Sequence, residues 1–173
     1  MKRRALLSLP LLAAACAEDP AQSYIWGIGD PVRGAGLNAT RMLGDTSRWD
    51  GDPAGAAIAA AQLEFLARSL RDDPIWSFRV NPATIQELQA AVAEMRNALG
   101  ISLTASNADV ETLLRQASQA LRAGSEARAL AVLSGPNFTV PPQEVLRRLG
   151  SLPRLRRVSA AAGMAGNEIL SRR

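Results

Sequence analysis

Apolar side chains recur every three to four residues along most of the chain after residue 30, which is the spacing of an amphipathic α-helix. The clearest such stripe consists of Ile85, Leu88, Val92, Met95 and Leu99. Gly100 follows this stripe directly and is a typical helix stop. Alternation of β-branched and polar residues, the pattern of a half-buried strand, is nearly absent. The sequence therefore predicts an all-α fold, a single-domain bundle of about five to seven helices.

Three of the predicted helices begin with the same kind of dipeptide. Asp30-Pro31, Asp52-Pro53 and Asn81-Pro82 each place a hydrogen-bond acceptor at the N-cap and a proline at the first helical position. The predicted helices span about residues 31–43, 53–71, 82–99, 107–123, 125–133, 142–149 and 153–171. Glycine or proline ends most of them.

The periodic positions define the expected core. Besides the stripe named above, the side chains expected to face it are Val32, Ala35, Ala39, Met42, Leu43, Ile58, Ala61, Phe65, Leu66, Leu70, Val110, Leu113, Leu114, Ala117, Leu121, Val145, Leu146 and Leu149. A chain of this length can bury a substantial apolar core within one domain.

The first sixteen residues follow a different pattern. Lys2, Arg3 and Arg4 form a positive start, residues 5–12 form a short apolar run, and three alanines lead into Cys16, the only cysteine. A charged region, an apolar region and a small-residue cleavage site together are typical of a secretory signal. The apolar run is well below the ~20 residues of a transmembrane helix, so the pattern disfavours permanent spanning.

The segment Leu12-Ala13-Ala14-Ala15-Cys16 resembles the lipobox of bacterial lipoproteins. The resemblance covers this segment alone, and Ala13 stands where the lipobox usually has leucine. It implies that Cys16 becomes the new N-terminus and carries lipid, which anchors a protein that faces the periplasm. Ala17 stands where an aspartate would retain the protein in the inner membrane, which favours the outer membrane. There are two alternatives: cleavage after Ala15 or Ala17 by an ordinary signal peptidase, which would leave a soluble protein, and a segment that is not cleaved.

These patterns divide the chain into residues 1–15 (signal peptide), 16–29 (lipid-attachment cysteine and tether) and 30–173 (helical domain). Of the 20 basic residues, three leave with the signal, so 17 arginines face 16 acids and the balance gives no indication of nucleic-acid binding. Residues 144–173 hold seven arginines and two acids. That excess indicates contact with anionic lipid, contact with an acidic partner, or docking against the acidic body of the same chain.

The chain contains no histidine, which excludes serine–histidine and cysteine–histidine nucleophile pairs and removes the usual transition-metal ligand. An enzyme would have to rely on other groups, and Asp45, Asp50 and Asp52 crowd one predicted loop. The spacing of a calcium-binding EF-hand is not met, because Thr46 and Arg48 stand at ligand positions. We predict no catalytic residue, no metal site and no cofactor, and keep an enzyme based on these loop carboxylates as the alternative.

Three tryptophans, Trp26, Trp49 and Trp76, fall in predicted loops, and Arg33 lies near the first of them in sequence. One interpretation is that these aromatics are buried struts that pin non-helical segments onto the bundle. The other is a binding patch made of Trp26, Trp49, Trp76 and Arg33, since tryptophan and arginine are enriched at binding hot spots.

The sequence predicts an exported, lipid-anchored helical protein with a binding or scaffolding role at the cell envelope. The expected partners are the lipid bilayer, through acylated Cys16, and an envelope protein, but no nucleic acid. One alternative is a small envelope enzyme that uses Asp45, Asp50 or Asp52. The other is a peripheral membrane-contact module, which requires the arginines of residues 147–157 to be exposed on one face.

Overall fold

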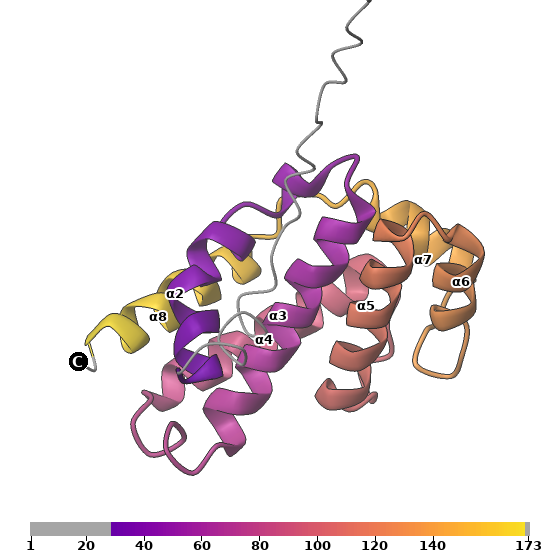
Figure 1. Cartoon of the computed structure of the whole chain (residues 1–173). Helices are drawn as coiled ribbons and strands as arrows, with labels where there is room; N and C mark the ends of the chain where they lie inside the picture. The colour runs from indigo at the N-terminus through magenta and orange to yellow at the C-terminus, as the bar shows by residue number, and fades with distance from the viewer. Residues whose placement is uncertain (1–28, 172–173) are drawn as a thin grey trace, which may run out of the picture.

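The computed structural model describes residues 29–171 and confirms the all-α prediction. Seven α-helices and a short 3-10 helix make up the regular structure of this range (Figure 1). In chain order they are α2 (Pro31–Leu43), the 3-10 helix η1 (Thr46–Trp49), α3 (Pro53–Asp72), α4 (Pro82–Leu99), α5 (Asn107–Arg122), α6 (Glu126–Val132), α7 (Pro142–Leu149) and α8 (Arg156–Ser171). An isolated antiparallel bridge between Ile101 and Phe138 ties the α4–α5 loop to the segment before α7. The predicted signal, Cys16 and Trp26 lie outside the described residues.

The three predicted helix starts are all N-caps. Asp30 and Asn81 each accept a hydrogen bond from the backbone N–H two residues further on, at 2.9 Å in both cases. Asp52 Oδ1 accepts from Gly55 N at 2.8 Å. These bonds satisfy donors that the first turn of a helix cannot satisfy itself, so the local sequence fixes where α2, α3 and α4 begin.

Helix α3 is the centre of the fold, with 15 of its 20 residues buried. It packs against α2, α4, α5 and α7, and Figure 1 shows it between α2 and α5. A helix that is apolar around its whole circumference belongs in the interior. Residues 54–61 are alanine except for Gly55 and Ile58, and their small side chains let the neighbouring helices approach closely. Neither α3 nor any other helix in residues 29–171 combines the length and apolar content needed to cross a bilayer.

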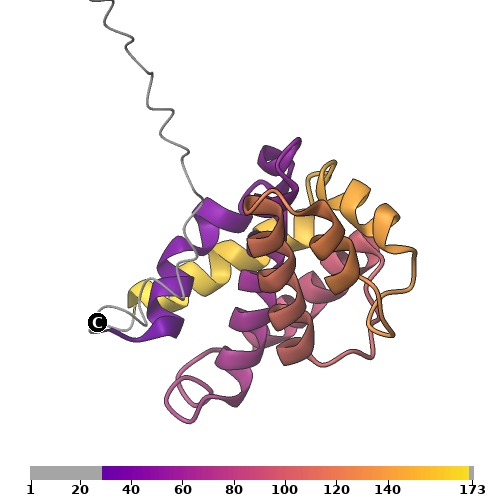
Figure 2. The same cartoon turned by 45° about the vertical axis from the view of Figure 1, so that its right-hand side comes forward.

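The last helix, α8, packs against α2 and α4, far from it in sequence (Figure 2). The crossing of α2 and α8 is set by glycine: a Cβ atom added to Gly36 would lie 2.3 Å from Ile169 Cγ1. On the facing helix, a Cβ added to Gly166 would lie 3.5 Å from the carbonyl oxygen of Gly36. The two helices therefore meet at a distance that a larger residue at position 36 does not allow.

Helix α8 begins at Arg156, later than the predicted start at Pro153. The reason is Thr46 of η1, which is fully buried. Its hydroxyl donates to the Pro153 carbonyl oxygen at 2.5 Å and accepts from the backbone N–H two residues later at 2.9 Å. This holds the segment before α8 against η1. Glu94 of α4 then accepts hydrogen bonds from the second and third amides of α8, at 2.9 and 3.0 Å, and caps the helix from outside.

The predicted core is buried at most positions. The buried members are Val32, Ala35, Ala39, Met42, Leu43, Ile58, Ala61, Leu66, Leu70, Leu88, Val92, Met95, Leu99, Val110, Leu114, Ala117, Val145 and Leu149. Five others are only partly buried, namely Phe65, Ile85, Leu113, Leu121 and Leu146. Periodicity identifies the stripe of a helix that faces inward, but the margins of that stripe are covered only where a neighbouring helix happens to reach.

A buried ion pair joins α3 to α4, and sequence analysis did not identify it. Arg96 Nε and Nη2 donate to the two carboxylate oxygens of Glu64, both at 2.8 Å, and neither side chain is more than 4% exposed. Arg96 Nη1 donates to three backbone carbonyl oxygens of residues 102–105, at 2.8 to 3.3 Å. Asn107, the first residue of α5, donates from Nδ2 to Glu64 Oε2 at 2.7 Å. One polar cluster thus fixes three helices and the loop between two of them.

Substituting Gly36 tests the close crossing of α2 and α8. Gly36→Ala should lower the free energy of unfolding by about 1–3 kcal/mol, because the new methyl group overlaps Ile169. Gly163→Ala is the matched control, since its added Cβ would meet no heavy atom within 4 Å, and it should raise stability by about 0.5–1 kcal/mol. Urea unfolding followed by circular dichroism measures both. A neutral or stabilising Gly36→Ala would contradict this account of the crossing.

Candidate functional site

The acidic loop is the first candidate site, and two of its three carboxylates hold helix starts. Asp45 Oδ1 caps η1 by accepting from Ser47 N at 3.2 Å and from Ser47 Oγ at 2.7 Å. The hydrogen bond from the Ser47 side chain is the main cause of a lowered pKa for Asp45. Asp52 caps α3, whereas Asp50 is exposed between them. In residues 29–171 no three acidic, cysteine or histidine side chains are grouped closely enough to hold a metal ion.

Trp49 and Trp76 are both buried, with 6% and 4% of their surface exposed. The indole Nε1 of Trp49 donates to the Met42 carbonyl oxygen at 2.9 Å, which ties η1 back onto the end of α2. The indole Nε1 of Trp76 donates to Asp30 Oδ2 at 2.6 Å, which ties the α3–α4 connection to the start of α2. Each ring therefore pins a non-helical segment to the bundle.

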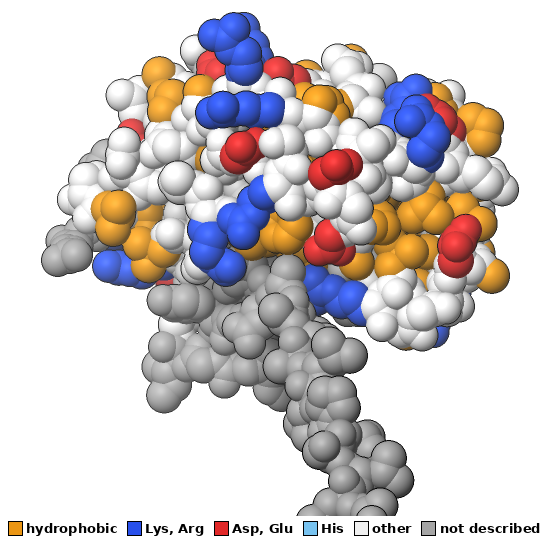
Figure 3. Space-filling view, turned by 90° about the horizontal axis from the view of Figure 1, so that it is seen from above, with side chains coloured by type: hydrophobic (Ala, Val, Ile, Leu, Met, Phe, Trp, Pro, Cys, Tyr) orange, Lys and Arg blue, Asp and Glu red, His pale blue; other side chains and the backbone are white. Residues whose placement is uncertain are grey.

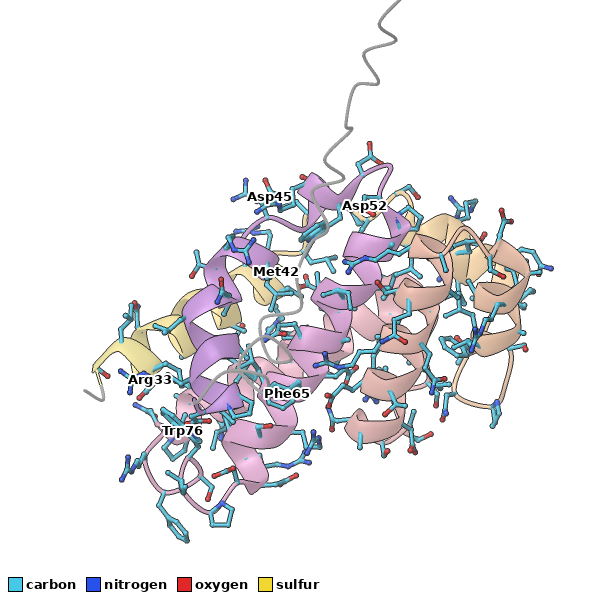
Figure 4. All side chains as sticks on the ribbon, viewed as in Figure 1. Arg33, Met42, Asp45, Asp52, Phe65 and Trp76 are labelled. Carbon is cyan, nitrogen blue, oxygen red and sulfur yellow. The ribbon has the colours of Figure 1, made fainter. Side chains whose placement is uncertain are left out.

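The predicted patch is not assembled from these residues in the part of the chain that the structure describes. Trp49 lies by the last turn of α2 and Trp76 by its first, and a helix of 13 residues separates the two positions by about 18 Å. Figure 4 shows Arg33 near Trp76, at the opposite end of the molecule from Asp45 and Asp52. The burial of Trp49 and Trp76 fits the alternative interpretation, internal struts. Trp26 lies outside the described residues.

A basic hollow lies at the end of the molecule formed by η1, the start of α3 and the segment that leads into α8. Arg154, Arg156 and Ser159 line this hollow, which has a volume of about 380 Å³. Both arginines are exposed, and Arg154 lies close enough to Asp45 to lower the pKa of that carboxyl. Figure 3, which views this end, shows basic and acidic side chains interspersed over it. The basic hollow is therefore local and does not belong to a broad positive face.

Other arginines of the C-terminal region have carboxylate partners. Arg147 and Arg148 both bond to Glu144 at 2.7 Å, and these hydrogen bonds, that of Arg147 foremost, lower the pKa of Glu144 to about 2. Arg157 lies 3.5 Å from Glu87 of α4. The arginine excess of the C-terminal region is thus partly neutralised by ion pairs within the fold. Arg154 and Arg156 differ from these arginines in that they line the basic hollow.

A second polar group lies between α3 and α5 and was also missed by sequence analysis. Glu111 of α5 accepts from Arg68 Nη2 at 3.0 Å and from Arg115 Nε at 3.3 Å. Burial raises the pKa of Glu111 and lowers the pKa of Arg115. The spacing of Glu111 and Arg115 on one helix could have suggested their pairing, but nothing in the sequence relates either to Arg68. Glu111 bonds to both arginines of this group, which fits a structural role.

Comparison with known proteins gives no family assignment. No family model matches the chain, and no curated protein or solved structure shows a significant match to it. A proposal about function therefore has to be built from the residues of this chain.

The assignment of Asp52 as a helix cap leads to a direct test. Asp52→Ala should lower the free energy of unfolding by about 1 kcal/mol, because the Gly55 amide loses its acceptor. Asp50→Ala, in the same loop but without a capping role, should change it by less than about 0.5 kcal/mol. Thermal and urea unfolding measure both, with and without added calcium. A cost for Asp52→Ala as small as that for Asp50→Ala would contradict the capping account. Stabilisation by calcium that disappears in Asp50→Ala would restore the loop-carboxylate alternative.

Proposed function

We propose that this chain is an exported, lipid-anchored protein of the cell envelope that acts by binding or scaffolding rather than by catalysis. The observation that carries this proposal is the N-terminal pattern: a positive start, an apolar run too short to span a bilayer, three alanines and then the only cysteine. The proposed anchor is acylated Cys16, the proposed compartment is the periplasm, and the outer membrane is favoured by Ala17.

The capping hydrogen bonds of two loop carboxylates weigh against the enzyme alternative. The enzyme alternative needs Asp45, Asp50 and Asp52 to converge on a substrate. Asp45 and Asp52 instead accept hydrogen bonds from backbone amides at the starts of η1 and α3. Asp50 is therefore the one carboxylate of this loop that does not cap a helix. A pair of carboxylates held in distinct environments is one common arrangement for general acid–base chemistry.

A second candidate function is peripheral contact with anionic lipid, and the basic hollow favours it. Arg154 and Arg156 are exposed side by side at one end of the bundle, and guanidinium groups bind phosphate in a bidentate manner. Because the positive charge is local, such contact would supplement a lipid anchor rather than replace it. Single charge contacts with an anionic leaflet contribute only about 1 kcal/mol each.

The test is to express the full-length precursor in a bacterium, fractionate the cells and determine the intact mass of the mature chain. We expect the protein in the membrane fraction, beginning at Cys16, with added mass of several acyl chains. Cys16→Ser should release it into the soluble fraction, because a single attachment point carries all the lipid. Inner and outer membranes separated by density then test the predicted outer-membrane location.

The matched control moves the thiol without removing it. The double variant Cys16→Ser, Ser23→Cys keeps one cysteine in the mature chain but places it away from the signal, and it should remain soluble. A soluble wild-type form beginning at Cys16 or Glu18 without lipid would contradict the proposal. If Cys16→Ser stays on membranes but is released by Arg154→Gln with Arg156→Gln, the second candidate function replaces the first.

A further inference from the structure

We propose that the connection between α3 and α4 contacts the lipid bilayer, with Ile75 and Phe78 as the side chains that enter its surface. Phe78 is 90% exposed and Ile75 is 60% exposed, which makes them the two most exposed large apolar side chains of residues 29–171. Single apolar side chains are common on protein surfaces, but these two and the exposed Pro74 together form an apolar tip. The inference deepens the proposed membrane location and rests on it.

Hydrogen bonds hold the backbone of the apolar tip. Asp73 Oδ1 accepts from Ile75 N at 2.8 Å, and the Asp73 carbonyl oxygen accepts from the N–H four residues further on at 2.9 Å. The Trp76 carbonyl oxygen accepts from Val80 N at 3.1 Å. The side chains of Trp76 and Val80 are both buried. The connection therefore buries two large apolar side chains and presents two others outward in a fixed arrangement, which lowers the entropic cost of binding through them.

The charges around the apolar tip suit the surface of a membrane. Arg79 follows Phe78 directly and is exposed. An arginine can place its guanidinium among phosphate headgroups while its stem covers apolar surface. The two acids before the tip are already engaged, because Asp72 bonds to Arg71 at 2.7 Å and Asp73 holds the turn. An aromatic side chain, an aliphatic one and a positive charge are the composition typical of elements that lie in a membrane interface.

The place where the chain enters the domain favours a bilayer as the occupant. Asp30, the N-cap of α2, accepts a hydrogen bond from Trp76 at 2.6 Å, so the start of α2 and the apolar tip lie at the same end of the bundle. Fourteen residue steps separate Asp30 from Cys16 and span at most about 50 Å. A bilayer that holds acylated Cys16 is therefore close to this end, and its high effective concentration populates even a weak apolar contact.

The size of the apolar tip fits a bilayer better than a protein partner. A stable protein interface buries about 800 Å² of each partner. The tip offers only Pro74, Ile75 and Phe78, with charged side chains before and after it in the chain. A bilayer accepts a few protruding side chains without a complementary surface of its own.

The basic hollow lies at the other end of α3 from the apolar tip. A helix of 20 residues separates the two ends by about 30 Å. Figure 4 shows this separation, with Trp76 at one end and Asp45 and Asp52 at the other. Membrane contact through the tip and membrane contact through the hollow thus require opposite orientations of the bundle, and a label at each end distinguishes them.

The experiment places an environment-sensitive dye at either end of a tethered domain. A hexahistidine tag replaces Cys16 in the mature chain, which has no histidine of its own, and attaches it to vesicles of phosphatidylethanolamine, phosphatidylglycerol and a nickel-chelating lipid. Ser77→Cys in the tip, or Ser151→Cys in the segment that leads to the hollow, carries the dye. We expect the emission at Ser77→Cys to rise at least twofold on vesicle binding, and the emission at Ser151→Cys to stay unchanged.

Removing the apolar side chains should abolish that rise. Replacing Ile75 and Phe78 together by serine should return the emission at Ser77→Cys to its value in water. Leu103→Ser is the matched control, because Leu103 is also exposed but follows the far end of α4, and it should leave the rise unchanged. If the double variant does not fold, as judged by circular dichroism, Phe78→Ser alone provides the comparison and should lower the rise by at least half.

The remaining outcomes overturn the proposal. These are an unchanged emission at Ser77→Cys, or a rise that survives the loss of both side chains. A rise at Ser151→Cys in its place would assign the membrane contact to the basic hollow. Self-association in sedimentation that Phe78→Ser abolishes, without an emission change on vesicles, would assign the tip to a second copy of this chain. Because the tag supplies the attachment, failure here leaves the acylation of Cys16 to its own test.

Discussion

The bidentate ion pair between Glu64 and Arg96 is the interaction on which the arrangement of this bundle depends. Both charges are buried, so each would carry a large desolvation cost if the other were absent. The remaining donors of Arg96 hold the backbone of residues 102–105, and Asn107 completes the carboxylate's partners. The pair thus fixes the positions of α3, α4, the loop after α4 and the start of α5 relative to one another. Apolar packing among short side chains such as alanine would determine these relative positions less precisely.

The two ends of the bundle, on either side of this ion pair, are held by different contacts. At one end, Trp76 ties the start of α2 to the connection after α3, where the tether joins the domain. At the other end, Thr46 holds the segment before α8, and the basic hollow of Arg154, Arg156 and Ser159 lies beside it.

Sequence patterns predicted the parts of the fold that are fixed locally. The starts of α2, α3 and α4 depend on a side chain and amides two or three residues away, so they can be read from neighbouring letters. The pairing of Glu64 with Arg96, and of Trp76 with Asp30, joins residues far apart in the chain, and periodicity carries no information about it. The same limit explains the tryptophans: the sequence placed them in loops but did not decide between exposed and buried. Asp45 in turn was expected only as a loop acid, because the short helix it caps has no periodic pattern.

A double-mutant cycle on Glu64 and Arg96, measured by urea unfolding, tests the central claim most directly. Glu64→Leu and Arg96→Met alone should each cost about 3–5 kcal/mol, since each leaves the other charge buried without its partner. The double variant should cost several kcal/mol less than the sum, because both charges are then gone. The exposed pair Arg71–Asp72 serves as the reference, where single substitutions should change stability by less than about 1 kcal/mol. Additive costs at Glu64 and Arg96, or single costs as small as those of the exposed pair, would contradict the account.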